Sequence, residues 1–406
     1  MTPALRRKLL FAALYFSEGA PIGFLWWALP TRLASAGVET ADITALTAAL
    51  VLPWTFKFLW APTIDALQFP RWTLRHWITL CQILMGLALV PLMFLNLADD
   101  FGLIRFFLIA HAVFAATQDV AIDAFCISMT EPEERGAYNG WMQAGMLVGR
   151  SILGGGALIL FSHFGQTTVL SMLLLAIFSS GILLWTLPLG RPIPVKHRHS
   201  TLAGTFREVF LSLKLAFEER ATWWAVLFAL TAAAAFEALG AVQGPFLRQH
   251  QMSEATIGWL MAVPYVIALA VGSLLGGYLA DRIGHRKLVA GSLIGFVVCV
   301  SVAGGLMISN PPDVQSLSIL IVANGFCIGI FTASTYAMFM NLSHPSVAGT
   351  QFSALMGATN GCEAWSAWSI GAISLQMPIG QGLWCLAVVS ILSLIFLRQL
   401  PGTRSA

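Results

Sequence analysis

The sequence predicts an all-α polytopic membrane protein in which twelve transmembrane helices form two pseudo-symmetric six-helix bundles. Three observations predict this fold. Of the 406 residues 57% are hydrophobic and only 10% are charged, and the mean hydropathy is +0.78, whereas soluble globular domains have roughly 25% charged residues. Apolar stretches long enough to cross a bilayer recur along the whole chain. Landmark residues repeat in the two halves.

Each predicted span is a mostly apolar stretch of roughly 17 to 25 residues, the length that crosses the hydrocarbon core as a helix. The approximate limits are 9–33, 41–63, 76–97, 103–127, 137–161, 168–189, 222–247, 255–280, 288–309, 316–340, 350–373 and 381–398. The longest polar connection, residues 190–221, contains six basic residues and is predicted to be a linker. One bundle is therefore expected at residues 1–189 and the other at residues 222–406.

The distribution of Lys and Arg predicts the orientation, because cytoplasmic loops are enriched in these residues. With the N-terminus in the cytoplasm, 17 of the 22 Lys and Arg residues lie on the cytoplasmic side and only Arg32, Arg105 and Arg248 on the other. Both termini are therefore predicted to be cytoplasmic. We expect a multi-pass protein of the bacterial inner membrane, in contact with the lipid bilayer.

The two halves carry matching landmarks at offsets of 213 to 219 residues. Asp65 and Asp281 close the second and eighth spans, and Glu18 and Glu237 lie inside the first and seventh. The turns Pro132-x-x-x-Gly136 and Pro345-x-x-x-Gly349 follow the fourth and tenth spans. Because the matched spans run in the same direction, a parallel duplication is indicated, with its axis along the membrane normal.

The turn after the eighth span has the most specific motif, Gly277-Tyr-Leu-Ala-Asp281-Arg282-Ile-Gly284-His-Arg286-Lys. This motif resembles the Gly-x-Leu-x-Asp-Arg-x-Gly-Arg-Arg signature of the major facilitator superfamily. An aspartate at a helix end can pair with basic groups, which can also pair with the C-terminal end of a neighbouring helix. The resemblance implies a gating latch; the equivalent turn of the first half keeps only Asp65 with more distant arginines.

Longer stretches resemble one branch of that superfamily, the AmpG-like muropeptide permeases and the related siderophore permeases of the RhtX/FptX type. The resemblance is carried by residues 15–21 (YFSEGAP), 57–62 (KFLWAP), 116–124 (ATQDVAIDA), 133–136 (EERG) and 349–355 (GTQFSAL). The chain is compact, with twelve spans and short tails, and in this it is more similar to the siderophore type.

Ionisable residues inside a span are rare and usually line an aqueous path or pair with each other. Asp119 and Asp123 are four residues apart and share one face of the fourth span, and Lys57 in the second span lies at a depth similar to that of Asp123. We therefore predict a buried cluster of Lys57, Asp119 and Asp123 with Arg150 close by. Two interpretations are open: Asp119 carries a coupling proton, or the cluster is a static ion network that packs the spans.

Glu18 and Glu237 occupy corresponding mid-membrane positions on the first and seventh spans. The resemblance implies that these two spans line a central cavity, so both residues are candidates for proton coupling. Other polar and aromatic residues within spans are candidates for contact with a bulky organic ligand. The candidate cavity residues are Glu18, Trp26, Trp27, Gln118, Arg150, Glu237, Asn360 and Glu363.

These observations favour a secondary active importer of a medium-sized organic solute that is coupled to protons and works by alternating access. No Walker pattern is present, so an ion gradient rather than ATP is expected to supply the energy. The resemblance favours a siderophore or metal-siderophore substrate. An anhydromuropeptide is the alternative, and an acetyl-CoA-type transporter or a non-transporting sensor is more distant. No enzymatic activity, cofactor, metal site, nucleic-acid binding or obligate protein partner is predicted.

Overall fold

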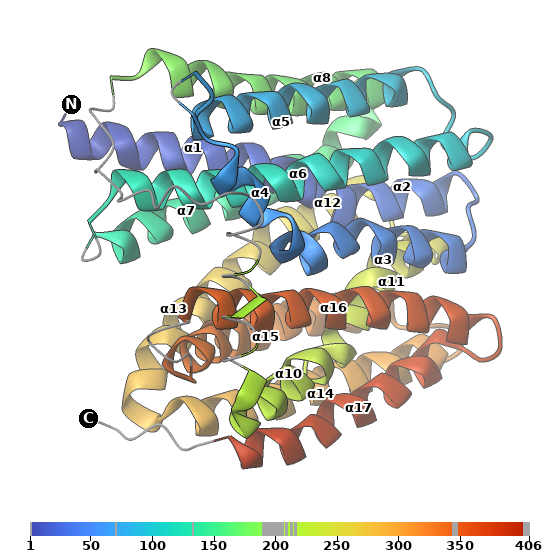
Figure 1. Ribbon diagram of the computed structural model, residues 1–406. Helices are drawn as coiled ribbons and strands as arrows, with labels where there is room; N and C mark the ends of the chain where they lie inside the picture. The colour runs from blue at the N-terminus through green and yellow to red at the C-terminus, as the bar shows by residue number, and fades with distance from the viewer. Residues whose placement is uncertain are drawn as a thin grey trace.

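The computed structural model consists of long, nearly parallel helices, and it describes residues 2–69, 71–131, 134–188, 207, 210–211, 214, 217–342 and 348–400. Pro132 and Pro345, with which the repeated turns begin, and most of the predicted linker 190–221 lie outside these residues. Figure 1 shows most helices of the first half above those of the second, with α12 of the second half overlapping the first, and the predicted two-bundle fold is confirmed. The bundle limits themselves stay a prediction.

The first half contains six spans, some of which are interrupted. They are α1 (Pro3–Gly23), η1 (Phe24–Ala28) and α2 (Leu29–Ser35); α3 (Thr40–Phe56), η2 (Lys57–Leu59) and α4 (Ala61–Ala66); α5 (Leu74–Leu89) and η3 (Val90–Met93); α6 (Phe101–Met129); α7 (Arg135–Arg150), η4 (Ser151–Gly155) and the first part of α8 (Gly156–Thr186); and the rest of α8. Gly165 has φ +77° and interrupts α8. The part of α8 before Gly165 ends the fifth span, and the part after it forms the sixth.

The second half also contains six spans. They are α10 (Arg220–Thr231) and α11 (Ala234–Gln249); α12 (Glu254–Leu260), η5 (Met261–Tyr265) and α13 (Val266–Ile283); α14 (His285–Ile308); α15 (Val314–Leu342); α16 (Ala348–Ser374); and α17 (Ile379–Gln399). Ten helical stretches of the described chain are apolar and long enough to cross a membrane. One of these stretches, Ala137–Thr186, contains both the fifth and the sixth span. The more polar α16 is a further span, so the described chain has twelve.

The start of α1 and the end of α17 lie at the same end of the bundles (Figure 1), which we call the terminal face; the other end is the opposite face. Helix interruptions have local causes in several spans. Pro62 has no N–H to donate to the carbonyl of Phe58, so the second span tightens around Lys57. Three spans contain a π-helical turn, η1, η4 and η5, and these turns lie against one another between the halves.

The seventh span is broken between α10 and α11 without proline or glycine. Two side chains satisfy backbone groups at the break. The Trp365 indole N–H donates to the Leu230 carbonyl (2.7 Å), and the Ala235 N–H donates to Ser390 Oγ (2.9 Å). Each bond replaces one that a continuous helix would make. The break places Glu237 in the first turn of α11, where a negative charge is favoured by the helix dipole.

Glycines let the two halves approach closely between η4 and α12. A Cβ added at Gly258 would lie 2.5 Å from the Gly155 carbonyl oxygen, and one added at Gly155 would lie 2.3 Å from the Ala262 nitrogen. Ser151 Oγ donates to the Ala262 carbonyl across the same contact (2.6 Å). The fifth and eighth spans therefore meet backbone to backbone, a packing that any side chain at these glycines would prevent.

Candidate functional site

The predicted pairing of Lys57 with Asp119 is present as a direct ion pair between the second and fourth spans. The side chains are 26% and 9% exposed, although both lie within membrane-spanning segments. A charged pair at this depth needs water or further polar groups around it. Lys57 keeps part of its surface free for such groups, whereas Asp119 is nearly enclosed.

Asp123 bonds to a residue that the sequence did not single out for the site. The Tyr15 hydroxyl, on the first span, donates to Asp123 Oδ1 (2.6 Å). Lys57 interacts electrostatically with Asp123 as well as with Asp119. Lys57, Asp119 and Asp123 thus lie together, and Tyr15 extends this group to the first span. Tyr15 belongs to the stretch 15–21 that carries the family resemblance, which was the one signal available.

Glu18 lies beside this cluster and is nearly inaccessible, with 2% of its surface exposed. It interacts electrostatically with Asp119, Lys57, Asp123 and Arg150, and its Oε2 atom has no hydrogen-bond partner. Gln118 is fully buried, and neither its amide oxygen nor its amide nitrogen has a partner. Buried polar atoms without partners are uncommon and suggest a place for water or a ligand.

Arg150 lies between the acidic residues of the two halves. Its charge acts on Glu18 in the first half and on Glu237 and Glu363 in the second. The approach of the first and fifth spans fixes its position, since a Cβ at Gly23 would lie 2.6 Å from the Arg150 Cα. We expected Arg150 beside the Lys57 cluster; the described residues show no ion pair or hydrogen bond from it to Asp119 or Asp123, and its charge is shared with the second half.

Aromatic side chains connect the halves near Glu363. The Trp26 indole N–H donates to the Glu363 carboxylate, and the Trp26 ring meets the Trp54 ring edge to face at 5.9 Å. Trp27 meets Tyr265 of the eighth span in the same way at 5.7 Å. Trp26, Trp27, Asn360 and Glu363 are each partly exposed. Trp26 and Trp27 of the first half thus contact the second half directly, at Glu363 and Tyr265.

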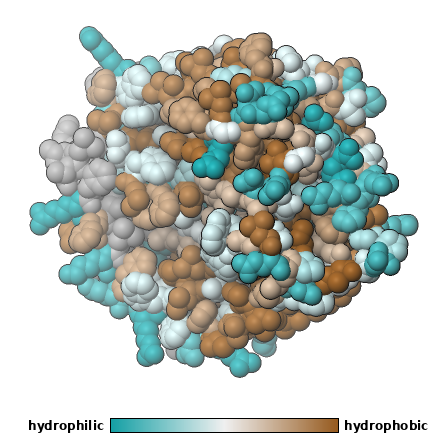
Figure 2. All heavy atoms as spheres, turned by 90° about the vertical axis from the view of Figure 1, so that its right-hand side faces the viewer, coloured by the Kyte–Doolittle hydropathy of each residue, from teal (hydrophilic) through white to brown (hydrophobic). Residues whose placement is uncertain are grey.

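A cross-half polar cluster at the opposite face was not predicted. Arg32 Nη1 lies 3.0 Å from both carboxylate oxygens of Glu254, and Ser35 Oγ donates to Glu254 Oε1 (2.6 Å). Arg248 Nε donates to Ser35 Oγ (2.9 Å). We call Arg32, Ser35, Arg248 and Glu254 the outer clamp. It joins α2 of the first half to α11 and α12 of the second, on a face where hydrophilic side chains lie among apolar ones (Figure 2).

Most residues of the motif after the eighth span belong to the described part of the chain. Gly284 has φ +92°, a conformation that favours glycine, and ends α13. Arg286 donates from Nη2 to the Arg398 carbonyl (2.8 Å) and from Nη1 to the Leu400 carbonyl (3.4 Å), at the C-terminal end of the neighbouring helix α17. Arg282 lies over the Tyr278 ring, and Gly277 is in open space. The side chains of Asp65 and Asp281 lie outside the described residues.

Arg286→Ala is expected to lower the free energy of unfolding by about 1 kcal/mol, because two charge-assisted bonds to the end of α17 are lost. Chemical unfolding of the purified protein in detergent measures this. Lys287→Ala is the matched control, since Lys287 is the next residue and is exposed. Equal stability of the two variants would show that Arg286 does not hold α17.

The sequence matches the Major Facilitator Superfamily over residues 9–242 and 229–406. The chain therefore belongs to this superfamily, and it is a multi-pass membrane transporter. It is 24% identical over 401 residues to AmpG 4 of Rickettsia conorii, with 95% of this chain and 94% of that protein covered. It is 23% identical over 357 residues to the anhydromuropeptide permease of Escherichia coli K12, with 86% of this chain and 70% of that protein covered.

Solved structures show the same fold at low sequence identity. A D-xylose-proton symporter superposes with a TM-score of 0.78 at 12% identity, with both chains fully covered. The nucleoside transporter NupG superposes with a TM-score of 0.75 in its D323A mutant, at 11% identity, covering 98% of this chain and 100% of that one. These similarities support the fold and say nothing of the substrate.

Proposed function

We propose that this chain imports an anhydromuropeptide-type solute, a cell-wall sugar linked to a short peptide, by proton-coupled alternating access. The observation that carries the proposal is the series of interacting charged residues that extends from the first half into the second, from Lys57 and Asp119 through Glu18 and Arg150 to Glu237 and Glu363. Intramembrane charges of this kind mark substrate and proton pathways in transporters.

The similar proteins support the anhydromuropeptide over the siderophore that the compactness of the chain had favoured. One relative is named an anhydromuropeptide permease, and further relatives are named AmpG. A sugar-peptide also suits the side chains available. Trp26 and Trp27 offer ring faces to a sugar, Arg150 offers a cation to a carboxylate, and Glu237 and Glu363 offer anions to an amine.

In this proposal the outer clamp holds the two halves together at the opposite face, so that face is closed in this conformation. Arg32 and Ser35 come from the first half, and Glu254 comes from the second, so the clamp must separate when the halves rock apart on that side. If both termini are cytoplasmic, that face is the side from which the solute is imported. The proton candidates Glu18, Asp119 and Glu237 lie between the clamp and the terminal face.

Uptake by a strain lacking this chain, with and without its gene supplied on a plasmid, tests the proposal. We expect labelled anhydromuropeptide to accumulate only when the chain is present, and a proton uncoupler to abolish the accumulation. Labelled ferric siderophore serves as the competing substrate, and Glu237→Gln, which keeps the shape but removes the charge, should reduce accumulation without loss of protein from the membrane. Uptake of the siderophore alone, or uptake driven by sodium, would refute the proposal.

A further inference from the structure

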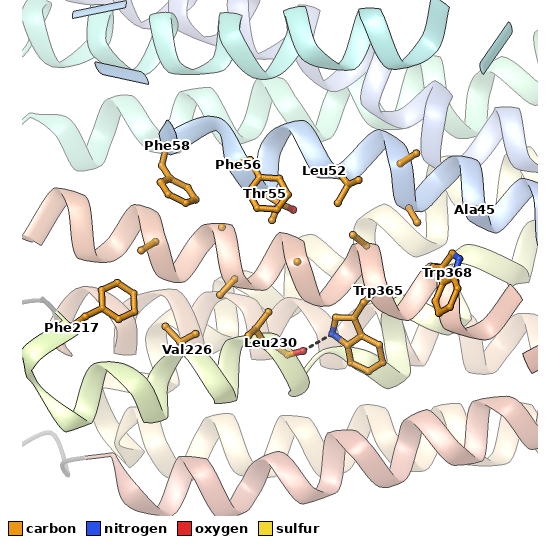
Figure 3. A pocket seen from close by; sticks show the side chains of 17 residues that line it. Ala45, Leu52, Thr55, Phe56, Phe58, Phe217, Val226, Leu230, Trp365 and Trp368 are labelled. Atoms are coloured by element: carbon orange, nitrogen blue, oxygen red, sulfur yellow. Dashed lines mark hydrogen bonds between the residues drawn. The ribbon is translucent and has the colours of Figure 1, made fainter. Parts of the chain in front are cut away.

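An apolar groove of about 760 Å³ runs along the seam between the two halves on the outside of the bundle. One wall is α3 of the first half, and the other is α10 and α16 of the second (Figure 3). We call it the seam groove. The lining residues are Ala45, Ala48, Ala49, Leu52, Thr55, Phe56, Phe58, Phe217, Val226, Leu230, Ala354, Gly357, Ala358, Gly361, Ala364, Trp365 and Trp368.

Three lining residues have side-chain hydrogen-bonding groups, and two of these groups are already engaged. The hydroxyl of Thr55 donates to the Val51 carbonyl, and the indole N–H of Trp365 donates to the Leu230 carbonyl. The indole of Trp368 lies at the rim and is 59% exposed. A ligand that fills the groove must therefore be apolar, because a polar group would lose its hydrogen bonds to water without replacement.

Small residues on the floor and large residues on the rim create the groove. A Cβ at Gly357 would lie 2.8 Å from the Thr55 carbonyl oxygen, so α3 and α16 touch at the floor. Leu52 and Phe56 stand at the rim and are 44% and 45% exposed. All these helices cross the membrane, so the exposed side of the groove faces the acyl chains of lipids and not water.

The direction of the groove matches that of a lipid chain. Figure 3 shows its lining from Phe217 and Phe58 at one end to Ala45 and Trp368 at the other, parallel to the helices. The exposed charged residues Lys214, Glu218, Glu219 and Arg220 flank Phe217 in the sequence and mark the membrane boundary there. The groove therefore begins at the level of the lipid headgroups and extends inward.

We propose that the seam groove is a binding site for one acyl chain of a membrane phospholipid. The volume lies in the range of roughly 300–1,000 Å³ that is typical of small-molecule sites. Both halves form its walls, so a bound chain contacts both at once. Trp365 also bonds to the break in the seventh span. A lipid chain that fits the seam groove only in this conformation of the two halves stabilises this conformation over the other conformations of the transporter. The proposal is independent of the transported solute.

The test uses the full chain reconstituted with a phospholipid that carries a photoreactive diazirine in one acyl chain. We expect labelling to concentrate on the lining peptides of α3 and α16, and native mass spectrometry of the purified protein to show one retained phospholipid. Ala49→Phe and Ala358→Phe place a ring in the groove from opposite walls, and each should reduce labelling and retention several-fold.

Val388→Phe is the matched control, because Val388 is 58% exposed on α17, outside the groove. It should leave labelling and retention unchanged, and circular dichroism checks that all three variants are folded. Even labelling of all exposed helix faces, or unchanged retention by both groove variants, would overturn the proposal. So would cross-links from the groove to a second copy of the chain or to its own linker.

Discussion

Gly258→Leu is expected to reduce transport roughly 100-fold while the protein remains folded in the membrane. A Cβ at Gly258 would lie 2.5 Å from the Gly155 carbonyl oxygen and 2.9 Å from the Leu158 Cβ. Overpacking of this kind costs about 3 kcal/mol, which lowers the population of the closed arrangement by about two orders of magnitude. The variant should therefore accumulate with its opposite face open.

Two measurements check this expectation. The first is the initial rate of uptake in vesicles. The second is the reaction of a Gln243→Cys variant with a membrane-impermeant maleimide added at the opposite face, since Gln243 is only 4% exposed in the closed arrangement. The control is Gly291→Leu, because a Cβ at Gly291 meets no atom within 4 Å. Normal uptake by Gly258→Leu would mean that this contact is not required for transport.

Lys57→Met is expected to abolish transport and to lower the free energy of unfolding by about 3 kcal/mol. The substitution leaves Asp119, whose side chain is 9% exposed, as a negative charge without its direct partner. Breaking a buried pair from one side is costly because the remaining charge stays desolvated. Lys57→Arg keeps the charge and should retain most of the stability.

The double variant Lys57→Met with Asp119→Asn separates the two interpretations of the cluster. Removal of both charges should restore most of the stability, since no uncompensated charge remains. If Asp119 carries a coupling proton, the double variant should still fail to accumulate solute against a gradient. Accumulation at the normal level would assign the pair to packing alone. Chemical unfolding measures the stability of the variant, and proton-driven uptake in the same vesicle preparation measures its transport.

The spans could be predicted from sequence because the bilayer imposes a minimum length of apolar helix. The predicted span 288–309 corresponds to α14 at His285–Ile308, for example. The cluster of Lys57 with Asp119 and Asp123 was also predictable from depths counted from the span ends, although depth matched Lys57 to Asp123 and the direct pair forms with Asp119. By contrast, the break in the seventh span falls in a run of alanines, which are strong helix formers. Only Trp365 and Ser390, distant in sequence, reveal why the helix stops.

The parts of the site that join the halves could not be predicted for a similar reason. Arg32 and Glu254 are 222 residues apart, and each looks like an ordinary charge at the end of a span. Neither hydropathy nor spacing within one helix relates them. Arg150 was placed by depth alone, and depth cannot tell which neighbouring helix a long side chain reaches.

The outer clamp is expected to make the closed arrangement of the opposite face sensitive to the salt concentration on that side of the membrane. Arg32, Arg248 and Glu254 are 29%, 37% and 11% exposed at their side chains, so dissolved ions can approach them. The screening length in water falls from about 10 Å at 0.1 M salt to about 3 Å at 1 M. Salt on the side of the opposite face therefore weakens the clamp and favours opening, whereas the same salt at the terminal face leaves it untouched.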